Sequence, residues 1–140
     1  MNIRMIGLTA ALLLFGAFTA FGETQTIRDA QGRTVGTVTI NGDRATYRDA
    51  QGRVTMTSHT SGGTTTYRDA QGRIISTVTH GSGGRATVRD AQGRTIGTSS
   101  TSGNQTTYRD AQGRTVGTAT HSGNGTTYRD GRGRTTGTKR

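Results

Sequence analysis

The sequence predicts an all-β protein made of six 20-residue strand-turn-strand repeats. The heptapeptide "YRDAQGR" or a close variant returns at spacings of 20 or 21 residues, and β-branched and aromatic residues flank it. The 3.6-residue apolar period of a helix is missing from the repeats. We expect the units to form an extended antiparallel β-hairpin meander, with a β-solenoid as the alternative.

Residues 1–22 differ in chemistry from the rest and predict a cleaved signal peptide. Arg4 precedes an apolar run, and Ala20 and Gly22 occupy the −3 and −1 positions of a cleavage site. The run is shorter than the roughly 20 residues that a membrane-spanning helix needs. We therefore expect an exported chain, residues 23–140, that forms one β-repeat domain of six units, the last truncated, without a transmembrane segment. Its expected location is extracellular or at the cell surface, with the periplasm as the alternative.

The composition limits how this domain can be stabilised. The chain has 18 Lys plus Arg against 8 Asp plus Glu, a net charge of +10, and neither Cys nor Pro. An exported chain without cysteine has no disulfides, so backbone pairing must supply the stability. Large apolar residues are sparse, and each unit therefore needs its neighbours to complete a core.

The repeated D-A-Q-G-R segment predicts a tight hairpin turn in every unit. Its Asp can accept hydrogen bonds from backbone N–H groups ahead of it, and its Gly supplies the positive φ that a type I turn with a G1 bulge requires. The predicted turn residues are Asp29, Gly32, Asp49, Gly52, Asp69, Gly72, Asp90, Gly93, Asp110, Gly113, Asp130 and Gly133. The second turns, such as "TSGG" and "TSGN", are looser clusters of Gly, Ser and Asn.

The turn also predicts a strand register. If Asp110 and Arg114 form the cross-strand pair that flanks the turn, then Tyr108 lies opposite Val116 and Thr107 lies opposite Gly117. The same count in the other units brings apolar residues together on one face. The predicted core columns are Ile27, Val35, Tyr47, Tyr67, Ile75, Val88, Ile96, Tyr108, Val116 and Tyr128.

The pattern Tyr-x-Asp-x-x-Gly-Arg at a 20-residue period, as in Tyr67 to Arg73, resembles the YD repeat of RHS proteins. That resemblance implies β-hairpins laid side by side in a long antiparallel sheet. Ile27 and Val88 replace the Tyr in two units, and the chain lacks the length of an RHS shell. The layout of a signal peptide and short Gly- and Thr-rich units is similar to that of curli-type subunits.

The sequence predicts no catalytic, metal or cofactor site. His59, His80 and His121 lie at or beside the second turns, where solvated turn residues are the simpler interpretation than metal ligands. The one Asp per unit already has a turn role, and phosphate-loop and calcium-repeat motifs are absent from the sequence. We expect neither an enzyme nor a small-molecule substrate.

The first functional hypothesis is an exported structural subunit that assembles with copies of itself. In-register repeats, the poor core and the lack of Pro predict fibres or a biofilm matrix of amyloid-like character.

The second hypothesis is binding of an anionic polymer such as extracellular DNA, an acidic glycan or lipopolysaccharide. The residues that would bind it form two columns, Arg28, Arg48, Arg68, Arg89, Arg109 and Arg129, and Arg33, Arg53, Arg73, Arg94, Arg114 and Arg134. Since the basic residues outnumber the acidic ones, part of this charge must face solvent.

A third hypothesis is ice binding by a Thr array, because Thr-x-Thr pairs resemble those of insect-type antifreeze solenoids. The pairs are Thr37/Thr39, Thr55/Thr57, Thr77/Thr79 and Thr118/Thr120. Strand propensity offers a simpler reason for the same Thr content.

Overall fold

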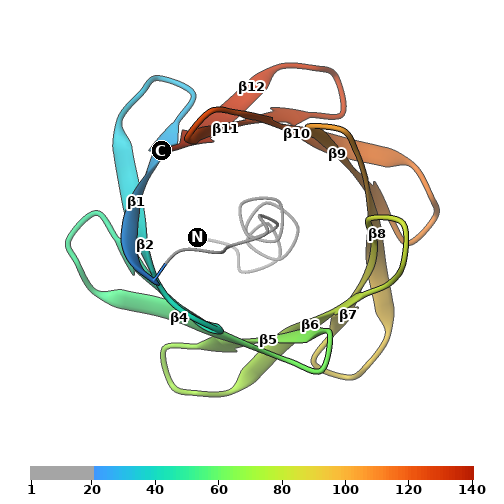
Figure 1. The fold of residues 1–140 in the computed structure, drawn as a ribbon, viewed down its shortest axis with the longest axis horizontal. Coiled ribbons are helices and arrows are strands. Elements are labelled where there is room, and N and C mark those ends of the chain that lie inside the picture. The colour runs from blue at the N-terminus through green and yellow to red at the C-terminus, as the bar shows by residue number, and fades with distance from the viewer. Residues whose placement is uncertain (1–20) are drawn as a thin grey trace.

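The computed structural model describes residues 21–140 as twelve antiparallel strands that close into a barrel (Figure 1). The strands are β1 (Phe21–Asp29), β2 (Thr34–Asn41), β3 (Arg44–Asp49), β4 (Val54–Ser61), β5 (Thr64–Asp69), β6 (Ile74–His80), β7 (Arg85–Asp90), β8 (Thr95–Ser102), β9 (Gln105–Asp110), β10 (Thr115–Ser122), β11 (Gly125–Asp130) and β12 (Thr135–Lys139). Over this range, no helix is long and apolar enough to cross a membrane. The predicted signal peptide lies outside the described residues except for Phe21 and Gly22, which begin β1.

Each strand pairs with its neighbours in the chain, and β1 also pairs with β12. The all-β prediction is confirmed, but the expected open meander is wrong because its two ends meet, and the solenoid alternative is wrong because successive strands are antiparallel. The physical reason is curvature. Register shifts recur within the hairpins that the D-A-Q-G-R turns connect, and such bulges add twist and bend until a sheet of this width closes on itself.

The predicted register is wrong by one residue. Tyr108 lies opposite Gly117 rather than Val116, and Thr107 lies opposite Thr118, because the ladder steps from Thr115 directly to Gly117. Val116 is therefore the extra residue of a bulge. Since side chains alternate across a strand, this one-residue shift places each later side chain of the strand on the face opposite to the predicted one.

The bulge explains why part of the predicted core is exposed. Val35 and Ile75 occupy the same place as Val116 in their own units, and they are 45% and 42% exposed. Ile96 and Val116 are half-buried and pack against the edge of the core. The residues that face the barrel interior at this level include Gly97 and Gly117, which are buried.

The predicted tyrosine column does lie inside the barrel. Tyr47, Tyr67, Tyr108 and Tyr128 are at most 5% exposed. Two units carry the smaller Ile27 and Val88, on β1 and β7, which are separated by five strands in either direction around the barrel. The two smaller side chains therefore lie on opposite walls. We interpret this placement as the way the lumen accommodates four phenol rings without overpacking.

Candidate functional site: an arginine rim and a polar lumen

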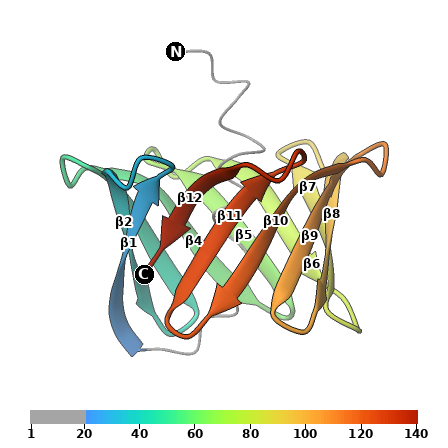
Figure 2. The same ribbon diagram turned by 90° about the horizontal axis from the view of Figure 1, so that it is seen from above.

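The six repeat turns, five of them D-A-Q-G-R and the last D-G-R-G-R, all lie at one end of the barrel. They flare outward as a pinwheel in Figure 1 and form the upper edge in Figure 2. This follows from the up-and-down topology, in which every odd-numbered strand leads into such a turn. We call this end the arginine rim, and it consists of the turns at 29–33, 49–53, 69–73, 90–94, 110–114 and 130–134 together with the Arg that precedes each of them.

Each turn is fixed by its Asp. In the second unit, Asp49 Oδ1 accepts hydrogen bonds from the backbone N–H groups of Gln51 and Arg53, both at 2.9 Å. Gly52 has φ 81°, a value at which an L side chain is strained. The backbone N–H of Arg53 holds the pKa of Asp49 below its ordinary value, against a smaller opposing effect of desolvation. The same bonds recur in the other five turns.

The same carboxylates pair with one of the two predicted arginine columns. Arg53 Nε lies 2.8 Å from Asp49 Oδ2, and the other five turns have an equivalent ion pair at 2.7 Å. These guanidinium groups remain largely exposed, with Arg53 at 76%. The column of Arg33, Arg53, Arg73, Arg94, Arg114 and Arg134 is thus neutralised locally.

The other column has no carboxylate partner in the described residues. Arg48 Nη1 donates a hydrogen bond to the carbonyl oxygen of Gly52 at 3.2 Å, and Arg28, Arg68 and Arg129 make the equivalent bond in their own turns. Among residues 21–140, every Arg–Asp ion pair uses the turn Arg instead. The rim therefore carries a surplus of positive charge, to which Arg132 adds in the last turn.

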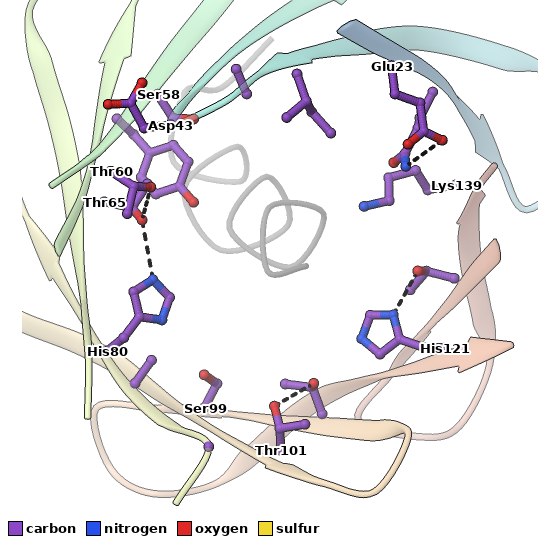
Figure 3. Close-up of a pocket in the computed structure, with 18 of the residues that line it drawn as sticks. Glu23, Asp43, Ser58, Thr60, Thr65, His80, Ser99, Thr101, His121 and Lys139 are labelled. Atoms are coloured by element: carbon purple, nitrogen blue, oxygen red, sulfur yellow. Dashed lines mark hydrogen bonds between the residues drawn. The ribbon is translucent and has the colours of Figure 1, made fainter. Parts of the chain in front are cut away.

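At the opposite end, the barrel holds a cavity of about 960 Å³ (Figure 3). Residues from all twelve strands line it. Tyr47 and Tyr67 lie on its inner side, while Gly42, Gly103 and Gly123 belong to the second turns at its mouth. The cavity wall carries several Ser and Thr hydroxyls among apolar surface. It lies at the other end of the barrel from the arginine rim.

The three histidines do not share one environment. His80 and His121 line the cavity, where His80 Nε2 is 3.2 Å from Thr65 Oγ1 and His121 Nδ1 is 2.9 Å from Thr126 Oγ1. His59 is not part of the cavity wall, and its Nε2 is 3.0 Å from Asp43 Oδ2. His59 precedes its turn by one residue more than the others do, and that difference reverses its face. Within residues 21–140, no group of three His, Cys, Asp or Glu could hold a metal ion.

Lys139 is the site residue that the sequence analysis did not identify. It is only 5% exposed, and Figure 3 shows its amino group directed into the cavity. Burial lowers its pKa to about 8, although Glu23 opposes that change. A sequence signal existed, because Lys139 is the one charged member of an inward-facing column. The other members of that column are Val38, Ser58, Val78, Ser99 and Ala119.

The Thr-x-Thr pairs occupy the outer wall. Thr37 and Thr39 alternate with the buried Gly36, Val38 and Ile40 on β2. Comparable outward Thr positions recur around the barrel, so the array follows a curved surface. Ice binding by these residues stays a prediction.

Comparison with protein-family models and with curated proteins gave no match to this chain. The resemblances to YD repeats and to curli-type subunits therefore stay predictions.

Proposed function

We propose that the protein is a secreted β-barrel that binds anionic polymers through its arginine rim. One observation carries this proposal: six arginines at the same end of the barrel have no carboxylate partner in the described residues, whereas the neighbouring six do. The Asp of each turn is already occupied by backbone N–H groups and by its own Arg. The guanidinium groups of the column that precedes the turns, Arg48 among them, can therefore exchange their counterions for phosphate, sulfate or carboxylate groups.

The spacing of the charges favours a polymer over a small anion. Equivalent residues recur on every second strand, which corresponds to roughly 9.5 Å along a sheet. A single small anion cannot bridge several such groups, whereas a chain of phosphates or sugar acids can contact many of them at once. Several weak contacts then add up to useful affinity. The expected partners are extracellular DNA, an acidic glycan or lipopolysaccharide, and secretion itself rests on the signal peptide predicted for residues 1–22.

A pair of matched triple variants tests this proposal. Arg48→Gln/Arg68→Gln/Arg109→Gln removes three charges from the rim, whereas Arg44→Gln/Arg85→Gln/Arg140→Gln removes three charges at the other end of the barrel, where Arg140 lies beside the second turn at Gly125. Both variants have the same net charge. We expect the rim variant to bind heparin at least tenfold more weakly, with a shallower dependence of affinity on salt, and the control to stay within about twofold of the parent. Equal losses in the two variants would show that net charge alone attracts heparin and would overturn the proposal.

Self-assembly into fibres is the second candidate, and one feature of the barrel seam favours it. Three residue pairs join β1 to β12, and Thr26 and Arg140 add a fourth across the seam, whereas seven pairs join β1 to β2. Among the described residues, Glu23 to Gln25 pair with β2 alone, so a short strand edge remains there. Such an edge can accept a strand from a second copy.

Electron microscopy and thioflavin fluorescence at rising protein concentration test self-assembly. If the seam opens to link copies, Thr24→Pro should suppress assembly. The N–H of Thr26 bonds to Arg140 across the seam, and alternation along the strand puts the N–H of Thr24, two residues earlier, on the same exposed edge. Thr24→Lys, which places a charge at the same edge, should suppress assembly as well. A monodisperse monomer of the parent at high concentration would end this candidate and leave polymer binding unaffected.

A further inference from the structure

We propose that one half of the arginine rim docks on an anionic lipid surface, where the arginines bind headgroup phosphates and exposed Val and Ile side chains enter the layer between them. This inference rests on the proposed function, because it takes the rim as the anion-binding end of the barrel. It narrows the expected partner from anionic polymers in general to anionic groups that lipids carry. The apolar residues concerned, which we call the rim strip, are Val35, Val54, Ile74 and Ile75.

The first argument is where the exposed apolar side chains lie. Among residues 21–140, the large hydrophobic side chains that remain exposed are the four of the rim strip, at 37% to 45%. Each of them follows a repeat turn by at most two residues, and Val54 comes directly after the turn residue Arg53. The rim strip therefore lies at the arginine end of the outer wall. Single apolar residues scattered over a surface need no explanation, but their collection at one end marks a contact surface.

The second argument is that the rim strip lies beside arginines without a carboxylate partner. Arg48 is the register partner of Val54, and Arg68 is the register partner of Ile74. Directly opposite side chains share a face of the sheet, with Cβ atoms about 4.5–5.5 Å apart. Hydrogen bonds of 3.2 and 3.0 Å to a turn carbonyl hold the two guanidinium groups at the rim. Cations and aliphatic side chains side by side are typical of surfaces that lie in a membrane interface.

The third argument is that the rim strip occupies one half of the ring. Its residues belong to β2, β4 and β6, in the three consecutive hairpins drawn from blue to green in Figure 1. In the other three hairpins, the residue opposite the unpaired arginine is Thr95, Thr115 or Thr135. Because the turns flare outward at this end, a tilted barrel can bring the first three hairpins to a flat layer together.

The charge of the rim selects the occupant. A second copy would cover the rim strip only by bringing two arginine rims together, in a chain whose net charge is +10. A soluble nucleic acid or glycan would neutralise the arginines but leave the Val and Ile side chains in water. An anionic lipid layer suits both, because its phosphates accept hydrogen bonds from guanidinium groups and its interfacial region takes up short aliphatic side chains.

The test is co-sedimentation with vesicles at pH 7 and 150 mM NaCl, together with heparin affinity measured on the same preparations. The vesicles are phosphatidylcholine alone or phosphatidylcholine with about 30% phosphatidylglycerol. Residues 1–22 are apolar and would bind vesicles themselves, so the chain is purified after export. Mass spectrometry verifies that all variants compared have the same N-terminus. We expect the parent to bind the anionic vesicles at least tenfold more tightly than the neutral ones.

Two variants change the rim strip without changing any charge. Val54→Thr/Ile74→Thr/Ile75→Thr introduces the residue that other units carry at the equivalent positions, so strand propensity is kept. We expect it to bind anionic vesicles at least tenfold more weakly and heparin within about twofold of the parent. Thr95→Val/Thr115→Ile extends the strip to the other half of the ring and should strengthen vesicle binding at least threefold. Circular dichroism verifies the fold, and the second variant decides if the first does not fold.

The two readouts separate this inference from the proposed function. A parent that binds heparin but not anionic vesicles overturns the lipid inference and leaves polymer binding in place, whereas a parent that binds neither overturns both. Vesicle binding that is unchanged in both strip variants would show that the apolar side chains take no part. If the parent is a dimer in size-exclusion chromatography and the triple Thr variant a monomer, a second copy covers the strip, and the inference is wrong.

Discussion

Asp49 contacts Arg53 twice, once through the side chain, with Arg53 Nε 2.8 Å from Asp49 Oδ2, and once through the backbone, with the Arg53 N–H 2.9 Å from Asp49 Oδ1. One carboxylate thus shapes the turn and neutralises one arginine. Because all six turns repeat this arrangement, the arginine just before each turn, such as Arg48, is left to face solvent.

Two substitutions of Asp69 separate these roles. Asp69→Asn keeps an oxygen that can accept from Gln71 N and Arg73 N but removes the ion pair with Arg73. Asp69→Ala removes both. Since exposed ion pairs contribute little and a lost turn acceptor leaves backbone donors unpaired, we expect Asp69→Ala to lower the melting temperature clearly more than Asp69→Asn does. Equal melting temperatures, measured by circular dichroism, would mean that the carboxylate does not organise the turn.

The turn glycines give a prediction that depends on closure of the barrel. Gly72, Gly113 and Gly133 all have φ 81°, and no neighbouring atom lies within 4 Å of an added Cβ, so the cost of a side chain there is conformational. Each substitution by Val should cost at least about 1 kcal/mol of unfolding free energy. In an open array the terminal unit would lose less because it has one neighbour. In the closed barrel β12 pairs with both β11 and β1, so Gly133→Val should cost about as much as Gly72→Val in urea denaturation.

Buried ionisable groups predict how stability varies at alkaline pH. Lys139 has a pKa of about 8 when folded against 10.5 ordinarily, so between these values the unfolded chain binds more protons and stability rises with pH, by about 2 kcal/mol from pH 8 to 10. Burial raises the pKa of Tyr47 from 10 to about 12, so above pH 10 the unfolded chain binds fewer protons and stability falls.

Urea midpoints at pH 7.5, 9.5 and 11.5 measure this dependence. We expect the highest midpoint at pH 9.5. Lys139→Met should abolish the rise and leave the alkaline fall in place, whereas a rise that persists in this variant would show that a group other than Lys139 causes it.

The sequence was informative wherever a local rule applied. The heptapeptide indicated hairpins, since the conformations of Asp, Gly and Arg in a turn depend on a few neighbouring residues. It did not indicate closure, because closure depends on the accumulated twist and tilt of twelve strands rather than on any one of them. The bulge at Val116 was missed for a related reason. A bulge leaves no mark on the amino-acid types in the strand, yet it turns the side chains of Val35 and Ile75 out of the core.

The lumen site was less predictable than the rim. The arginine columns recur once per unit and are visible in the sequence alone. Lys139 and Gln25 come from the two ends of the described chain, and only the seam between β1 and β12 brings them to one wall. His121 could be noticed as a turn residue, but its inward direction depended on the register.

A designed disulfide across the seam tests the central claim of closure most directly. Thr26 and Arg140 exchange two backbone hydrogen bonds, of 2.6 and 3.1 Å, and such pairs have Cα atoms about 5.5 Å apart, within the range of a disulfide. The natural chain has no Cys, so Thr26→Cys/Arg140→Cys introduces the only possible bridge. As a control, Thr26→Cys/Thr87→Cys joins β1 to the opposite wall on β7. The closed barrel predicts that the first variant oxidises to a disulfide-bonded monomer of parent mobility in size-exclusion chromatography, while the control forms no internal bridge. Free thiols or disulfide-linked multimers in the first variant would contradict closure of this chain on itself.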